Sequence, residues 1–223
     1  MPVTGNNPSG ISVQIGLNGF TYQTNDCARS EWLSAEFVFS SDVFQRNYNP
    51  IVLSAFIPRY TLVPASWFDE SQAQEYLNAA FSPVEGEDLR WRNLPAELGA
   101  VEVWSPTKTR LSHIISGMLA VGEEDILSEF HYLLTEGYRV DSYNKIIASY
   151  ADGRIYLVIF QGKNLMLCNS FEAPDFTTAQ DYIFMALNKF QLNPEASTIY
   201  FRTPLSAEEE LSLYHYFQSV KRL

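Results

Sequence analysis

The stretch 145–168, KIIASYADGRIYLVIFQGKNLMLC, decides the fold of this chain. It contains three apolar runs of strand length, separated by the dipeptides Asp152-Gly153 and Gly162-Lys163. Asp-Gly between two such runs is a strong signal for a two-residue hairpin turn. The stretch therefore predicts three antiparallel strands that follow one another in a meander.

The sequence after this meander predicts a helix, a strand and a second helix. The first helix is expected to begin at Thr177 and to end before Asn193, and the strand is expected at 198–201. Ser206 is expected to cap the last helix, whose apolar face would extend to Val220.

The first half of the chain predicts a looser version of the same order. Asn18-Gly19 is expected to form a turn through positive φ angles. The run 82–95 is rich in proline, glycine and charge and predicts a loop. We expect strands at 11–16, 20–22, 32–39 and 51–57, a helix after Asp69 at 73–81, and helices at 111–119 and 126–134.

The two halves of the chain indicate an internal duplication. The turn glycines Gly19 and Gly153 lie 134 residues apart, a spacing typical of two domain-sized units. We expect a disordered or extended N-terminus at 1–10, a first domain at 11–135 and a second at 136–223. This order of elements resembles two ribonuclease-H-like subdomains in an actin-like ATPase arrangement, an α/β (α+β) fold with mixed sheets.

Three short motifs carry a family resemblance that spans the chain from about Ile11 to its end. They are PRYTLVP at 58–64, WFDE at 67–70 and NSFE at 169–172. The chain resembles the bacterial domain-of-unknown-function family 3822. The resemblance implies an actin-like fold, similar to the pilus-assembly and cell-division relatives of actin, and it implies no established activity.

An actin-like ATPase would need an acidic residue at the end of the first strand of each half, and this sequence has none there. Gln14 stands at that place in the first half and Ser149 in the second. A neutral side chain cannot supply the charge that holds a magnesium ion and its waters. Asp152-Gly153 is explained by its hairpin turn, and Arg202-Thr203-Pro204 stands where a glycine pair would admit the adenosine. We therefore expect no catalytic, cofactor-binding or metal-binding residue, and no cofactor.

Other enzyme classes find no support in the sequence. A ribonuclease-H-like nuclease would need clustered carboxylates on the first strand, and the net charge of −11 disfavours nucleic acid as a partner. His113, His131 and His215 share no metal-binding spacing, and Glu129 to His131 is interpreted as the polar side of a helix. No serine stands in a nucleophile-elbow motif. Cys27 and Cys168 are far apart and predict two buried thiols in a reducing compartment.

The composition predicts a globular protein without membrane insertion. The chain has 223 residues and 46% hydrophobic residues, enough to bury a core of its own. Its longest apolar runs, such as 155–160, are far shorter than the roughly 18 residues of a membrane helix. The N-terminus shows no secretory-signal pattern, so we expect a cytoplasmic location.

Two classes of function remain after these exclusions. The first is a non-enzymatic actin-like protein with degenerate nucleotide-binding motifs that binds an unknown protein partner or itself, as a scaffold or assembly factor. Its aromatic content of 14% offers contact surface. The alternative is a divergent ATP-binding protein or ATPase that uses the interdomain cleft through Asn18, Asp152, Lys163 and Asp175. A regulatory domain that senses a metabolite is a third reading.

Overall fold

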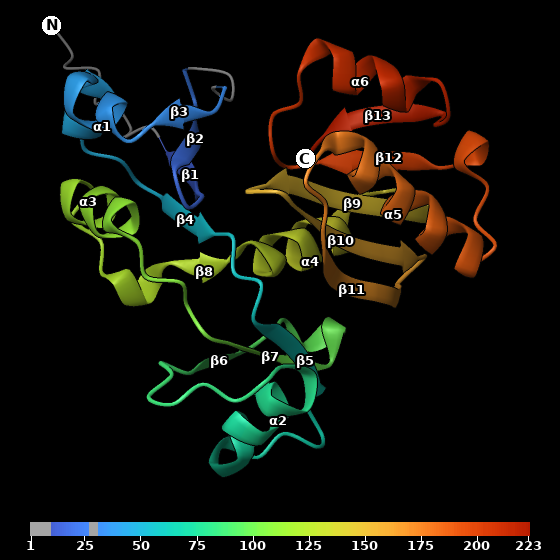
Figure 1. The fold of residues 1–223 in the computed structure, drawn as a ribbon, viewed down its shortest axis with the longest axis horizontal. Coiled ribbons are helices and arrows are strands. Elements are labelled where there is room, and N and C mark those ends of the chain that lie inside the picture. The colour runs from blue at the N-terminus through green and yellow to red at the C-terminus, as the bar shows by residue number, and fades with distance from the viewer. Residues whose placement is uncertain (1–9, 27–30) are drawn as a thin grey trace, which may run out of the picture. The chain divides into compact units, whose positions relative to one another are not determined.

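The computed structural model describes residues 10–26 and 31–223 (Figure 1). The expected disordered or extended N-terminus, 1–10, lies outside the described residues except for Gly10. Cys27 lies outside them as well, so the expectation of a buried thiol can be followed only at Cys168.

Contacts divide the chain into two compact units, and each unit is built from two segments. The first unit comprises residues 1–55 and 108–127, and the second comprises 56–107 and 128–223. The expected division into 11–135 and 136–223 stays a prediction, and its boundary falls inside helix α4 (Glu129–Arg139).

The first unit contains a five-stranded sheet of order β3-β2-β1-β4-β8. β1 pairs antiparallel with β2 and parallel with β4. Aromatic rings fill one face of this sheet; the Phe20 and Phe44 ring centroids, for example, lie 5.4 Å apart. The elements are β1 (Ile11–Ile15), β2 (Gly19–Thr24), β3 (Leu33–Ser34), α1 (Glu36–Ser40), β4 (Ile51–Ala55), α3 (Arg110–Met118) and β8 (Leu127–Ser128).

The strand expected at 32–39 is wrong beyond its first residues. Only Leu33–Ser34 pairs with β2, and α1 follows at once. The alternation that predicts a strand would place Phe37 and Phe39 on one face. In the helix, Phe37 instead meets the rings of the first unit, whereas Phe39 is 63% exposed.

The turn at Asn18-Gly19 joins β1 to β2 as expected, but its predicted backbone conformation is wrong. Neither residue has a positive φ. Glycine is required for another reason: a Cβ on Gly19 would lie 2.9 Å from the carbonyl oxygen of Leu33. The close approach of β3, and not the turn, explains this glycine.

The second unit contains the predicted meander within a five-stranded sheet of order β11-β10-β9-β12-β13. Asp152 and Gly153 have φ angles of 53° and 67°, which confirms the hairpin turn predicted from their identity. The elements of this sheet and its helices are α4, β9 (Asn144–Ala151), β10 (Arg154–Gln161), β11 (Asn164–Glu172), α5 (Phe176–Lys189), β12 (Thr198–Phe201), α6 (Ala207–Tyr214) and β13 (Ser219–Arg222).

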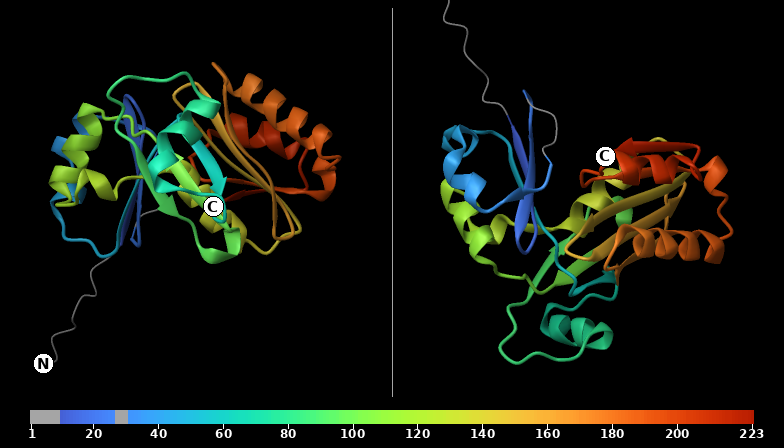
Figure 2. Two further views of the ribbon diagram at one scale, coloured as in Figure 1. Left: turned by 90° about the horizontal axis from the view of Figure 1, so that it is seen from below. Right: turned by 45° about the horizontal axis from the view of Figure 1, so that its top comes forward.

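Helices cover both faces of this sheet (Figure 2). The core on one face joins the strands to α5 and α6, for example Leu157 to Ile183 and Leu213. On the other face α4 packs closely at Gly137, where an added Cβ would lie 2.7 Å from Cγ1 of Ile147. The central strands β9 and β10 are therefore buried between helices on both faces, whereas the edge strand β11 is partly exposed.

The last helix is shorter than predicted. α6 ends at Tyr214, and β13 follows and pairs parallel with β12. Val220 still belongs to the core, as its apolar character predicts, but it reaches the core from a strand. The hydroxyl of Tyr214 donates a hydrogen bond to the carbonyl of Val220 and joins the helix to that strand.

The second unit also contains a three-stranded antiparallel sheet of order β5-β7-β6. α2 packs on it through Ala73 and Leu77. β6 lies within 82–95, where a loop was expected; the strand is polar and largely exposed, so its sequence shows no alternation. The elements are β5 (Tyr60–Pro64), α2 (Ala73–Ala80), β6 (Arg90–Asn93) and β7 (Ala100–Trp104). Single 3-10 turns in the two units lie at Asp42–Gln45, Glu70–Gln72, Ala96–Leu98, Glu123–Asp125 and Pro194–Ala196.

Candidate functional site: a buried ion pair at the strand ends

The candidate site of the second unit lies where β9 and β12 end and α4 begins. Ser149 is near the end of β9, Arg202 follows directly after β12, and Glu129 is the first residue of α4. β9 and β12 are parallel, so their ends meet at one edge of the sheet. The local sequence favours this helix start, because the hydroxyl of Ser128 caps α4 by accepting a hydrogen bond from the backbone N–H of Phe130.

Glu129, Ser149 and Arg202 form an ion-pair cluster with no open carboxylate. The Ser149 hydroxyl donates to Oε1 of Glu129 at 2.6 Å, and a guanidinium N–H of Arg202 donates to Oε2. Each of the three side chains is at most 1% exposed. A carboxylate buried to this degree is stable only with such partners, and its place in the first turn of α4 adds the favourable field of the helix dipole.

The rest of the Arg202 guanidinium lies beside a second acid and an aromatic ring of α4. Its Nε lies 3.5 Å from Oε2 of Glu136, and its central carbon lies 4.5 Å from the ring centroid of Tyr132. Burial raises the pKa of Tyr132 to about 12, so this ring remains a neutral phenol at ordinary pH. Arg202 is thus fixed by two acids and an aromatic face of α4.

A magnesium-bound nucleotide, which the fold implies, does not fit these residues. Both oxygens of Glu129 are engaged, Ser149 carries no charge, and the cationic Arg202 stands at the strand end itself. A metal ion here would have to displace Arg202 from a buried carboxylate. Among the described residues, no group of three or more His, Cys, Asp or Glu is arranged to hold a metal ion.

The first unit shows the same lack of an acid at its own strand end. Gln14 lies on β1 and is paired with Thr21 of β2 and with Ser54 of β4. All three are buried, and none carries charge.

A second buried carboxylate joins α4 to the three-stranded sheet. Glu102 of β7 is fully buried; it accepts a hydrogen bond from the Tyr60 hydroxyl at 3.1 Å, and its Oε1 lies 2.7 Å from Nδ1 of His131. Burial, reinforced by the Glu102 carboxylate, raises the pKa of Tyr60 well above its usual value and keeps it a donor. The interpretation of Glu129 to His131 as a polar helix side is therefore wrong, because this turn of α4 faces the interior.

The residues of the alternative ATP-binding hypothesis are only partly brought together. Asp152 and Lys163 lie at opposite ends of β10, which has eight residues and so spans roughly 26 Å. Asp175 lies nearer to the Asp152 turn, because the N–H of Ala173 donates to Gly153, but its own carboxylate caps α5 by accepting from the Thr178 N–H.

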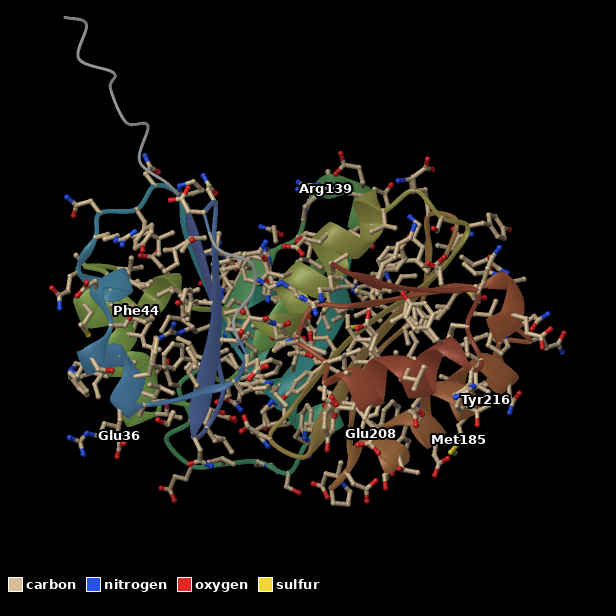
Figure 3. All side chains as sticks on the ribbon, turned by 90° about the horizontal axis from the view of Figure 1, so that it is seen from above. Glu36, Phe44, Arg139, Met185, Glu208 and Tyr216 are labelled. Atoms are coloured by element: carbon tan, nitrogen blue, oxygen red, sulfur yellow. The ribbon has the colours of Figure 1, made fainter. Side chains whose placement is uncertain are left out.

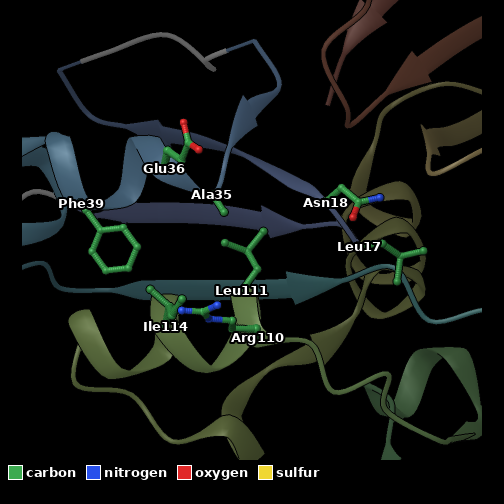
Figure 4. A pocket seen from close by; sticks show the side chains of 8 residues that line it. All are labelled: Leu17, Asn18, Ala35, Glu36, Phe39, Arg110, Leu111 and Ile114. Atoms are coloured by element: carbon green, nitrogen blue, oxygen red, sulfur yellow. The ribbon is translucent and has the colours of Figure 1, made fainter.

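Asn18 lines a different feature, a pocket of about 340 Å³ in the first unit (Figure 4). Apolar side chains dominate this pocket, with Glu36 and Arg110 at its wall. No residue of the ion-pair cluster lines it. The lining residues are Leu17, Asn18, Ala35, Glu36, Phe39, Arg110, Leu111 and Ile114.

The remaining histidines and the described cysteine lie outside the ion-pair cluster. Nδ1 of His113 lies 3.0 Å from Oε1 of Glu123, and His215 is the exposed residue that directly follows α6. Cys168 is a free thiol that is only half-buried, so the expectation of a buried thiol is met in part, and desolvation raises its pKa well above the usual value. In the described part of the chain, no helix is both long and apolar enough to cross a bilayer.

Solved structures with similar architecture identify the fold of this chain. A Bacteroides thetaiotaomicron protein with an actin-like ATPase fold and unknown function is 19% identical, with a TM-score of 0.66 over 100% of this chain and 93% of that chain. The cytoplasmic domain of EpsL, an inner membrane component of the type II secretion system of Vibrio cholerae, is 12% identical, with a TM-score of 0.50 over 89% of this chain and 83% of that chain. The fold is that of the actin-like ATPases, as predicted from the order of elements.

The family assignment is equally direct. The family model described as "Protein of unknown function (DUF3822)" matches residues 14–220, and the chain belongs to this family. The resemblance found in the sequence motifs is thereby confirmed. A comparison with curated proteins finds no match.

Sequence reasoning identified Ser149 and the position of Arg202 but missed the residue that joins them. Glu129 and Arg202 are 73 residues apart, so no local spacing connects them. One signal was available: Glu129 directly follows a capping serine and precedes Phe130, an arrangement that places it in the first turn of a buried helix.

Proposed function

We propose that this protein is a non-enzymatic member of the actin-like fold that acts by binding other proteins, as a scaffold or assembly factor. The observation that carries the proposal is the ion pair between Glu129 and Arg202. It occupies the strand ends at which an actin-like ATPase would need a free acid and room for its nucleotide.

The energetics of the pair support a permanent arrangement. Breaking a buried ion pair by removing one partner costs about 3–5 kcal/mol, because the other charge remains buried alone. A nucleotide or metal ion that displaced Arg202 would have to offset a penalty of this kind before it gained any affinity. The same residues form a stable buried contact between the start of α4 and the end of β12.

A binding role is compatible with the fold neighbours. EpsL is described as a component of a secretion system, and its cytoplasmic domain shares this fold. We extend to the present chain only the general idea that such a fold can take part in a protein assembly.

A nucleotide titration tests the proposal. We expect no rise in melting temperature with ATP, ADP or GTP in millimolar magnesium, and no heat of binding by calorimetry. A ligand present at 100 times its dissociation constant would add about 2.7 kcal/mol to the stability, which is easily detected. Magnesium alone and ATP with a chelator serve as controls.

The opposite result would restore the alternative of a divergent ATP-binding protein. A magnesium-dependent shift that saturates at micromolar ATP would contradict the proposal. The variants Asp152→Asn and Lys163→Met would then show whether the residues of that hypothesis take part.

A further inference from the structure

The two edges of the five-stranded sheet in the second unit differ in their protection. β13, at one edge, has only four residues and ends with the exposed Lys221 and Arg222. Short strands and charged side chains are common means of preventing edge pairing. β11, at the other edge, has nine residues and contains neither proline nor a basic residue (Figure 1).

The outer edge of β11 presents backbone groups that a further strand could pair with. The N–H of Ala173 donates to the carbonyl of Gly153, so Phe171 and Asn169 direct their backbone groups inward to β10. Cys168 and Ser170 therefore direct theirs outward. The Ser170 N–H is covered by the Asn169 side chain, which accepts from it at 2.8 Å. Within the described residues, no strand pairs with this edge.

The surface beside this edge is apolar. Leu165 and Met166 are each 37% exposed, and Met185 of α5 is 64% exposed and projects from the surface (Figure 3). A pocket of about 280 Å³ opens between β11 and α5. Its lining residues are Leu167, Asn169, Phe171, Tyr182, Met185, Ala186, Lys189 and Phe190.

Charge is distributed unevenly along the same edge. α5 runs back along β11, so Lys163 and Lys189 lie toward one end. Glu172, Asp175 and Asp181 lie toward the other end, and these five side chains are exposed. Arg154 of β10 pairs with Glu172 at 2.8 Å, which leaves Asp175 and Asp181 as the acidic side chains in excess at that end. The edge therefore has a basic end and an acidic end.

We infer that the partner of this edge is a second copy of the chain, paired antiparallel through β11 across a two-fold axis. Full overlap of the two strands places the axis at Cys168, which is the midpoint of β11. On α5, the axis passes beside Met185, which lies midway in sequence between Asp181 and Lys189. The pocket lined by Leu167 and Met185 lies at this level. An antiparallel pair places the basic end of each copy against the acidic end of the other, whereas a parallel pair would oppose like charges.

This inference rests on the proposed function in one respect: the proposed function is protein binding, and the partner named here is a protein, a second copy of the chain. A ten-stranded sheet across the axis would bury the exposed Met166 and Met185 and use the outward backbone groups of β11. The ion pair at the strand ends takes no part in it.

Mass measurement provides the first test. Light scattering of the full chain should give twice 25.4 kDa at high concentration and dissociate on dilution. Met166→Lys should weaken the dimer at least about tenfold, because an inward or edge lysine opposes strand pairing. Leu211→Lys on α6, where the leucine is 61% exposed, adds the same charge away from the edge and should leave the dimer unchanged.

Charge exchange provides the second test. Asp181→Lys and Lys189→Glu should each weaken self-association, since each opposes two pairs of like charges across the axis. An equimolar mixture of the two variants should recover the dimer, and so should the double variant. A misfolded variant would not be rescued by mixing, so recovery separates the interface from a folding defect.

Two results would overturn the inference: a monomer at all concentrations, or a dimer that Met166→Lys and the charge variants leave intact. Neither result bears on nucleotide binding, and an ATP-dependent thermal shift would not affect the dimer. The failure of this inference and the failure of the proposed function are therefore distinguishable.

Discussion

Removal of Arg202 should be far more damaging than removal of both charges of its ion pair. In Arg202→Met, Glu129 would remain buried at 0% exposure without its cationic partner, so the free energy of unfolding should fall by about 3–5 kcal/mol. In the double variant Glu129→Met with Arg202→Met, no charge is stranded. Its stability should lie within about 1 kcal/mol of the original or exceed it.

Urea unfolding measures this difference. With a slope of about 2–3 kcal/mol per molar urea, the single variant should lose about 1–2.5 M in its unfolding midpoint, and the double variant should recover it. Ser149→Ala, which removes one hydrogen bond to the same carboxylate, is the matched control and should cost about 1.5–3 kcal/mol. The reasoning would be refuted if Arg202→Met cost less than 1 kcal/mol, or if the double variant were as unstable as the single one.

Two further outcomes follow from the close packing of α4 and from the ion pair of Arg59. Gly137→Ala should destabilise the protein by about 1–3 kcal/mol, because the added Cβ would lie 2.7 Å from Cγ1 of Ile147. Gly117→Ala on α3 should instead stabilise it by about 0.5–1 kcal/mol, because the added Cβ meets no atom within 4 Å. Thermal unfolding measures both changes, and changes of the same sign in the two variants would contradict the reasoning. The Arg59 guanidinium lowers the pKa of Glu87 from 4.5 to about 2, so the stability that Glu87 contributes is present above pH 4.5 and is lost as the pH falls toward 2. Urea midpoints measured from pH 5 to pH 2 should fall more steeply in the original protein than in Glu87→Gln, and parallel curves would disprove the assignment.

The parts of the fold that could be predicted from the sequence are those determined by residues adjacent to one another in the chain. The hairpin at Asp152-Gly153 needs two positive φ angles, and this dipeptide favours them in any context. β13 and α1 were missed because the decisive interactions are distant. Val220 belongs to the core in either a helix or a strand, and only its pairing with Ile199 determines which of the two forms.

The candidate site, like the fold, could be predicted from the sequence only where the evidence is local. The neutral side chains of Gln14 and Ser149, at the positions where an actin-like ATPase is expected to carry acids, could be identified directly from the sequence. The partners of Glu102 could not, because Tyr60, 42 residues before it, and His131, 29 residues after it, meet only when β5, β7 and α4 are assembled. The sequence from Glu129 to His131 resembles a solvent-exposed helix turn, but in the folded protein these residues face the interior and contact other elements.

The division of each unit into two segments has a consequence for biosynthesis. The sheet of the first unit obtains its strand β8 only when residue 127 has been made, 72 residues after β4 ends at residue 55. At about 5–20 residues per second, the ribosome needs roughly 4–14 s to supply it. During this interval the nascent chain displays an incomplete sheet, and we therefore expect a gene fragment that stops at residue 107 to yield an insoluble product.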